Sequence, residues 1–135
     1  MPESLTFDSE PLLAFFLGEP GAETISDFLA KIQRREIEGF INVINLTEVY
    51  YILYRLNPSL ADENCRVLSH LGLTVVPVQD DGLWRNAARI KANHSLSLGD
   101  AFAVATAEKQ KSTLVIGSDK EFDGLTIRIL RTRKI

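Results

Sequence analysis

Short apolar segments rich in β-branched residues alternate with longer helical patterns along the whole chain. The predicted strands are Ser4–Phe7, Phe40–Ile44, Leu73–Val78, Thr113–Ile116 and Thr126–Leu130. Consecutive strands that are separated by helices connect through crossovers and therefore pair in parallel. We predict an α/β fold with three layers, in which a mostly parallel five-stranded sheet lies between helices. Alternation of Ile127 and Ile129 with Arg128 indicates that the last strand is an edge strand.

Glycine and proline residues mark the ends of the predicted helices. Gly39 and Gly72 stand where two helical patterns end, and Pro58 stops a third at the residue before it. The predicted helices are Pro11–Leu17, Ala22–Glu38, Leu46–Leu56, Ser59–Leu71, Asp80–Asn93 and Gly99–Lys111.

The composition is that of a globular protein with one domain. The chain has 135 residues, of which 45% are hydrophobic, and a single cysteine, Cys65, so no internal disulfide can form. No segment approaches the roughly 20 apolar residues of a membrane helix. Glu3 stands where a signal peptide would carry basic residues. We therefore expect a cytoplasmic protein without a membrane partner.

The net charge of −3 argues against nucleic-acid binding through bulk positive charge, although local cations remain compatible with it. The densest basic cluster is Arg128, Arg131, Arg133 and Lys134. This cluster is consistent with a solvated terminal strand and tail, or with contacts to phosphate groups.

Four acidic residues stand where apolar segments give way to helices or turns. They are Asp8, Glu48, Asp100 and Asp119. In a parallel sheet such positions lie along one edge, at the carboxyl ends of the strands. Converging carboxylates repel one another, so a cation between them is expected, and oxygen ligands suit Mg²⁺ or Mn²⁺. The pattern thus favours a metal-dependent phosphodiesterase.

Each acid also has a structural explanation, because acids accumulate at helix N-termini. Asp8 can cap the first helix, and Asp119 can cap a short turn over residues 120–122. The pairs Asn45 with Glu48 and Ser97 with Asp100 both have capping-box spacing.

The set of four is harder to explain by capping alone. Asp100 opens a helix whose next seven residues carry no charge, and Glu48 shares a helix face with Tyr51 and Ile52. Neither acid has a lysine or arginine one turn away on its own helix. Inward acids require compensation, and a metal ion supplies it.

Four segments together resemble PIN-domain ribonucleases, closest to the small prokaryotic branch that includes VapC-type toxins. The segments are Asp8-Ser9, Asn45-Leu46-Thr47-Glu48-Val49-Tyr50-Tyr51, Leu98-Gly99-Asp100-Ala101-Phe102-Ala103 and Gly117-Ser118-Asp119-Lys120-Glu121-Phe122. The resemblance covers nearly the whole chain. It implies that Asp8, Glu48, Asp100 and Asp119 are the catalytic and metal-binding residues, with Asp123 as an accessory. It also implies an RNA substrate, Mg²⁺ or Mn²⁺, a homodimer, and often an antitoxin that blocks the site.

In that case a metal-activated water attacks the phosphodiester, which leaves a 5′-phosphate and a 3′-hydroxyl. Ser9 and Ser118 are candidates for orienting a metal-bound water, or are ordinary polar residues of a helix start and a turn. The chain departs from the family pattern twice: Glu10 adds an acid beside the site, and Gly117 replaces the usual threonine.

Other interpretations stay open. The domain could be a PIN-like RNA- or protein-binding scaffold without turnover, or an RNA-processing nuclease without an antitoxin. A haloacid-dehalogenase-type phosphatase or a receiver domain fits the acid and lysine positions poorly. Tyr50, Tyr51 and Tyr54 are candidates for base stacking, although core and dimer contacts fit their helix better. Trp84 is expected to be a packing residue.

Overall fold

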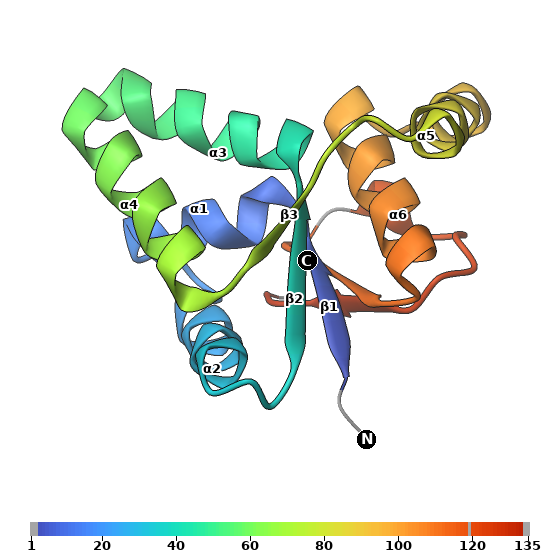
Figure 1. Ribbon diagram of the computed structural model, residues 1–135. Helices are drawn as coiled ribbons and strands as arrows, with labels where there is room; N and C mark the ends of the chain where they lie inside the picture. Colours follow the sequence, from blue (N-terminus) through green and yellow to red (C-terminus); the bar gives the residue numbers. More distant parts are fainter. Residues whose placement is uncertain (1–2, 119, 134–135) are drawn as a thin grey trace.

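The computed structural model describes residues 3–118 and 120–133, in which a five-stranded sheet lies between two layers of helices (Figure 1). The strands are β1 (Ser4–Phe7), β2 (Glu38–Asn42), β3 (Thr74–Val76), β4 (Thr113–Ile116) and β5 (Ile129–Arg131). Their order is β3-β2-β1-β4-β5, and every neighbouring pair is parallel. The predicted three-layer α/β fold is confirmed, with β5 at an edge, and this sheet is parallel throughout.

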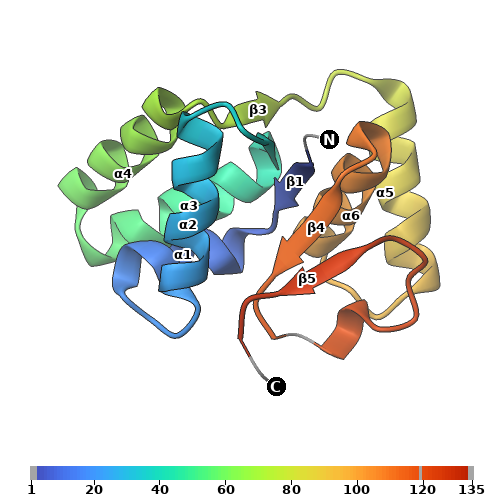
Figure 2. The same ribbon diagram turned by 90° about the horizontal axis from the view of Figure 1, so that it is seen from below.

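Helices cover both faces of the sheet (Figure 2). Four of them lie on one face: α1 (Ser9–Leu17), α2 (Ala22–Gln33), α3 (Val43–Leu56) and α4 (Pro58–Leu71). On the other face lie α5 (Asp81–Asn93) and α6 (Leu98–Gln110). Because strand side chains alternate, Leu114 and Ile116 of β4 pack beneath α5 and α6, while Val115 packs with α1–α4. A strand buried on both faces is apolar throughout, as this segment is.

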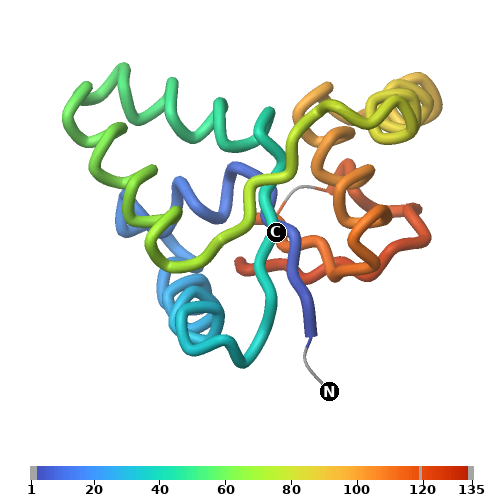
Figure 3. The backbone as a smooth tube through the Cα atoms, in the orientation of Figure 1, coloured from blue at the N-terminus to red at the C-terminus, as the bar shows by residue number. Residues whose placement is uncertain are grey.

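The chain enters the sheet at its central strand, which fixes where a site can form. From β1 it passes outward to β2 and β3, then returns through α5 and α6 to β4 on the other side of β1 (Figure 3). The direction of winding therefore reverses between β1 and β4. In open α/β sheets, ligands bind beside such a reversal, at the carboxyl ends of the strands.

The second helix is shorter than predicted. It ends at Gln33, and Arg35 then adopts a left-handed backbone conformation with φ 62°. Glu38 pairs with Ser4 of β1, so the residue that was expected to close the helix belongs to β2 instead. The sequence pattern of a helix continues beyond Gln33, but pairing of Glu38 with the central strand β1 ends the helix before it.

The start of α3 also differs from the prediction. Asn42, not Asn45, is the N-cap: its side-chain oxygen accepts a hydrogen bond from the Ile44 amide at 2.9 Å. Its Nδ2 donates to Thr106 Oγ1 on α6, also at 2.9 Å. The strand therefore ends two residues earlier than expected, and Val43 and Ile44 are helical.

Several large apolar side chains are exposed. Trp84, which was expected to be a packing residue, is 42% exposed, and its Nε1 donates to Asp81 Oδ1 at 3.2 Å. Tyr51 and Tyr54 are 42% and 50% exposed and lie outside the core, whereas Tyr50 is half-buried and packs against it. Within the described residues, no helix is long and apolar enough to cross a membrane.

Candidate active site

Asp8 lies at the reversal of the sheet, directly after β1. Its amide donates to the Val115 carbonyl of β4 at 3.0 Å, and its Oδ1 accepts from the Ser9 amide at 2.9 Å. The side chain is 3% exposed. It is therefore the N-cap of α1, as predicted, and also a buried acid held between the two central strands.

Asp100 and Glu48 approach Asp8 from helices on opposite faces of the sheet. Asp100 lies in the first turn of α6, where its amide donates to the capping Ser97 hydroxyl at 3.1 Å. The carboxyl groups of Asp100 and Asp8 are within hydrogen-bonding reach of each other. Glu48 is half-buried on α3 and accepts a hydrogen bond from the Ser9 hydroxyl. Three of the four predicted acids thus belong to one cluster.

Asn45 joins the members of this cluster. Its buried Nδ2 donates to the Gly99 carbonyl at 3.0 Å, to Glu48 Oε1 at 3.2 Å and to Asp8 Oδ1 at 3.4 Å. Asn45 was expected only to cap a helix, and its place in the site was not predicted. The available signal was its position one helical turn before Glu48.

The environment of the acids favours their protonated forms when no cation is present. Burial, and then the charge of Asp100, raise the pKa of Asp8 well above its usual range. Burial also raises the pKa of Glu48, and the charge of Asp100 adds to the effect, while hydrogen bonds from Asn45 and Ser9 lower it in part. A cation that binds here would offset both the cost of burying these carboxylate charges and their mutual repulsion.

Two glycines allow acidic side chains to pack closely against the backbone. A Cβ atom on Gly99 would lie 2.6 Å from both carboxylate oxygens of Glu48. A Cβ atom on Gly117 would lie 2.5 Å from the carboxyl carbon of Glu10. Neither position accepts a side chain while the carboxylates stay where they are.

The two departures from the family pattern, Glu10 and Gly117, are therefore neighbours in space. The carboxylate of Glu10 lies over Gly117, where a larger residue would not fit. Its Oε1 forms an ion pair with Nη2 of Arg133, from the segment that follows β5. The extra acid is thus compensated within the protein.

The remaining predicted residues have different settings. Ser9 is half-buried and contacts both Asp8 and Glu48, whereas Ser118 is half-buried after β4. Asp123 is exposed and forms an ion pair with Arg131. Asp119 lies outside the described residues.

The donor set fits a hard divalent cation in its chemistry, because every candidate ligand is a carboxylate oxygen. Among residues 3–118 and 120–133, no three acidic, histidine or cysteine side chains are gathered closely enough to hold a metal ion. Hydrogen bonds from Asn45 hold Asp8 and Glu48 near each other, and Gly99 leaves room for the carboxylate of Glu48.

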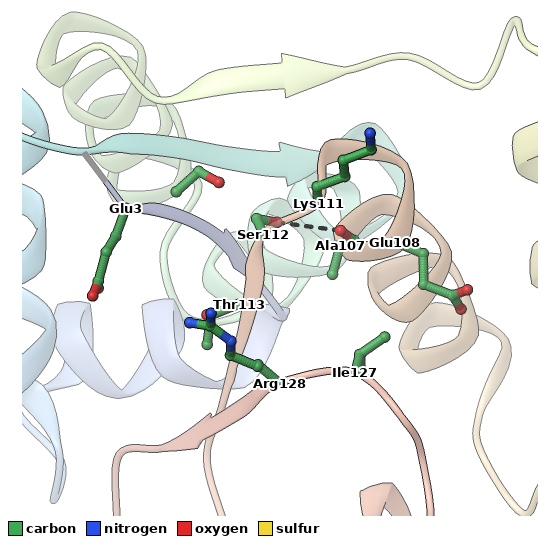
Figure 4. Close-up of a pocket in the computed structure, with 9 residues that line it drawn as sticks. Glu3, Ala107, Glu108, Lys111, Ser112, Thr113, Ile127 and Arg128 are labelled. Carbon is green, nitrogen blue, oxygen red and sulfur yellow. Dashed lines mark hydrogen bonds between the residues drawn. The ribbon is translucent and has the colours of Figure 1, made fainter. Parts of the chain in front are cut away.

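A pocket of about 440 Å³ opens at the opposite edge of the sheet (Figure 4). Its lining includes Glu3, Glu108, Lys111 and Arg128, and Ser112 donates a hydrogen bond there to the Ala107 carbonyl. The charges are of mixed sign, and the pocket lies at the amino ends of β1 and β4, away from the acidic cluster. We therefore place the candidate active site at the cluster.

The sequence also matches the model of a known protein family. The model of the PIN domain family matches residues 5–127, which span every described acid of the cluster. The chain belongs to the PIN domain family. A search among curated proteins finds no matching sequence.

Solved structures show the same fold at low sequence identity. A toxin–antitoxin complex from Klebsiella pneumoniae superposes with a TM-score of 0.74 at 18% identity, covering 97% of this chain and 99% of that chain. VapBC2 from Rickettsia felis, bound to a DNA fragment from its promoter, gives 0.73 at 14% identity, with 95% and 98% covered. FitAcB from Neisseria gonorrhoeae gives 0.69 at 16% identity, with 95% and 97% covered. The chain therefore shares its fold with chains of these three structures, one of which is a toxin–antitoxin complex.

Proposed function

We propose that the protein is a metal-dependent endoribonuclease that hydrolyses phosphodiester bonds of RNA. The main support is the pair of hydrogen bonds from Asn45 to Asp8 and Glu48, because they hold two acids that repel each other together beside Asp100. A fold gains nothing from bringing acids together in this way unless a cation binds between them. Mg²⁺ or Mn²⁺ would be held by Asp8, Glu48, Asp100 and Asp119.

Each residue of the site has a distinct task in this proposal. When bound, the metal would polarise the phosphodiester and lower the pKa of a water molecule, giving a 5′-phosphate and a 3′-hydroxyl. Asn45 and Ser9 orient the carboxylates by donating hydrogen bonds to them. Gly99 lets Glu48 reach the edge of the sheet. Ser118 and Asp123 are accessory candidates.

We further infer that the protein is the toxin of a toxin–antitoxin pair and acts in the cytoplasm. Support comes from the full-length likeness to the Klebsiella pneumoniae and Rickettsia felis complexes. An antitoxin and a second copy of the chain are the proposed protein partners. The exposed side chains of Tyr51, Tyr54 and Leu56 on α3 offer an apolar surface for such contacts.

Cleavage of a labelled single-stranded RNA by the purified protein tests the proposal. Cutting is expected with Mn²⁺, and neither with EDTA nor in Asp100→Asn, whose carboxylate charge is lost. Asp27→Asn, an exposed aspartate on α2, is the matched control and should cut like the wild type. Full activity of a folded Asp100→Asn protein would refute the assignment, and a folded wild type that binds RNA without cutting it would point to a scaffold.

A further inference from the structure

An arginine from the end of the chain lies at the acidic edge of the sheet. Arg133 follows β5, and Nη2 of its guanidinium forms an ion pair with Glu10 in the first turn of α1. The two residues are 123 positions apart in the sequence. Glu10 in turn lies against Gly117, directly after β4. The ion pair therefore joins the segment after β1 to the segment after the edge strand β5, and Glu10 also touches the segment after β4.

The guanidinium keeps donors that this ion pair does not use. An arginine carries five N–H donors, and Glu10 accepts from one nitrogen here. The Arg133 side chain is 33% exposed, so an incoming anion can reach part of it. Its Nε is buried and has no hydrogen-bond partner in the described parts of the chain. The surrounding protein thus holds the guanidinium in place without saturating it.

An RNA strand needs a cation at this edge. The buried or half-buried carboxylates of Asp8, Glu48 and Asp100 present negative charge to any phosphate that approaches the site. The whole chain carries a net charge of −3, so there is no general attraction to offset this repulsion. Arginine matches the geometry of a phosphate group and stays charged at any physiological pH.

We propose that Arg133 binds a phosphate of the RNA backbone beside the scissile one, and that Glu10 positions its guanidinium for this contact. The inference rests on the proposed nuclease function and adds to it a substrate-binding residue. Gly117 belongs to the same arrangement, because any side chain there would displace Glu10. Arg131 is less suited to this role, since its Nη2 is paired with the exposed Asp123.

RNA binding without cleavage tests the proposal separately from catalysis. Fluorescence anisotropy of a labelled single-stranded RNA is measured in EDTA, with Asp100→Asn as the parent protein. Arg133→Ala should weaken binding about 5- to 10-fold and reduce the slope of log affinity against log salt by about 0.7, the value for one phosphate contact on a single strand. Arg133→Lys, which keeps the charge but not the planar fork, should recover part of the loss.

Arg128→Ala is the matched control. It removes the same charge from the same end of the chain, but Arg128 lines the pocket at the opposite edge of the sheet. It should leave both the affinity and the salt slope as they are in the parent. Equal losses in the two variants would show a general charge effect and overturn the proposal, as would an Arg133→Ala protein that melts earlier but binds RNA unchanged.

Glu10→Gln tests the positioning role by the sign of its effect. Removal of an acid near a nucleic-acid site should by charge alone strengthen RNA binding. If Glu10 orients Arg133, the same change should weaken binding instead, by about 2- to 3-fold, which is less than one kcal/mol. Stronger binding would refute the positioning role. Metal-dependent cleavage by the wild type is scored separately, so failure of this inference leaves the nuclease assignment standing.

Discussion

The carboxylate of Glu48 lies against the backbone of Gly99, in a space that a methyl group would occupy. A Cβ atom at residue 99 would stand 2.6 Å from both carboxylate oxygens, far inside van der Waals contact. Asn45 ties the same two residues together, since its Nδ2 donates to the Gly99 carbonyl and to Glu48 Oε1. The position of one acid on α3 thus depends on the absence of a side chain on α6.

Gly99→Ala should therefore weaken metal binding. The methyl group would push Glu48 away from Asp8 and Asp100, and disturbing a residue that orients a ligand typically costs about 10- to 100-fold in metal affinity. Alanine is favoured over glycine inside a helix, so the fold should tolerate the change. Calorimetric titration with Mn²⁺ measures the affinity.

Gly82→Ala provides the control, because Gly82 is also the second residue of its helix, α5. Its Cβ atom would approach Asp80 Oδ1 no closer than 3.2 Å. Unchanged Mn²⁺ affinity is expected there. If Gly99→Ala also bound Mn²⁺ like the wild type, the packing of Glu48 on Gly99 would have no bearing on the site.

Asn45 should matter for stability as well as for metal binding. Asn45→Ala removes donors from two buried or half-buried acids, and the loss of such a buried partner costs about 1–3 kcal/mol. Asn45→Asp should cost more, because it replaces the donor with a further acceptor. Chemical denaturation in EDTA gives the free energy of unfolding.

The exposed Asn93 at the end of α5 serves as the comparison, and Asn93→Ala should unfold like the wild type. An Asn45→Asp protein as stable as the wild type would mean that the hydrogen bonds of Asn45 do not hold the acids together.

Removal of Asp100 should stabilise the metal-free protein. Its charge raises the pKa of both Asp8 and Glu48, which means that it destabilises their ionised forms. Asp100→Asn should therefore raise both the free energy of unfolding and the melting temperature of the metal-free protein. Thermal unfolding in EDTA measures this, with Asp27→Asn as a variant of equal charge change.

The sign of that effect separates a functional cluster from a structural one. Replacing a residue that serves stability lowers the stability of the protein, whereas replacing a residue that serves function often raises it. A lower melting temperature for Asp100→Asn in EDTA would assign the carboxylate a structural role. Added Mn²⁺ should reverse the order, because only the wild type keeps the full set of acids.

The sequence allowed the sheet and part of the site to be predicted for a physical reason. Thr113–Ile116 is a run of apolar residues that suits only a strand buried on both faces, and both of its boundaries were predicted correctly. Asp8 follows the neighbouring strand and Asp100 opens the helix that leads to this one. Once the strands are parallel, their carboxyl ends share an edge, and these two acids must approach each other.

Contacts between distant segments could not be predicted in the same way. The sequence pattern placed the cap of α3 at Asn45, whereas the cap is Asn42, whose side chain also donates to Thr106, 64 residues away. The ion pair between Glu10 and Arg133 likewise has no local signal. Local propensity cannot choose between equivalent residues when a tertiary contact decides.

The stability of the metal-free protein should depend on pH through Asp8 and Glu48. The pKa values of Asp8 and Glu48 are raised in the folded protein above the values of 3.8 and 4.5 for the free groups, mainly by burial. At pH values between the pKa of the free group and the raised pKa, the folded state therefore binds more protons than the unfolded state. The contribution of these groups to stability is fully present below the unfolded pKa and is lost as the pH rises through the folded pKa.

In EDTA, the free energy of unfolding of the wild type should thus fall relative to Asp8→Asn as the pH rises above about 4. Metal binding should show the opposite trend, because Mn²⁺ competes with protons for the same oxygens and gains affinity as they leave. Urea unfolding and Mn²⁺ titration across this range measure both trends. A constant difference between the two proteins at all pH values would show that Asp8 carries no raised pKa, and the electrostatic argument for a cation at this site would then fail.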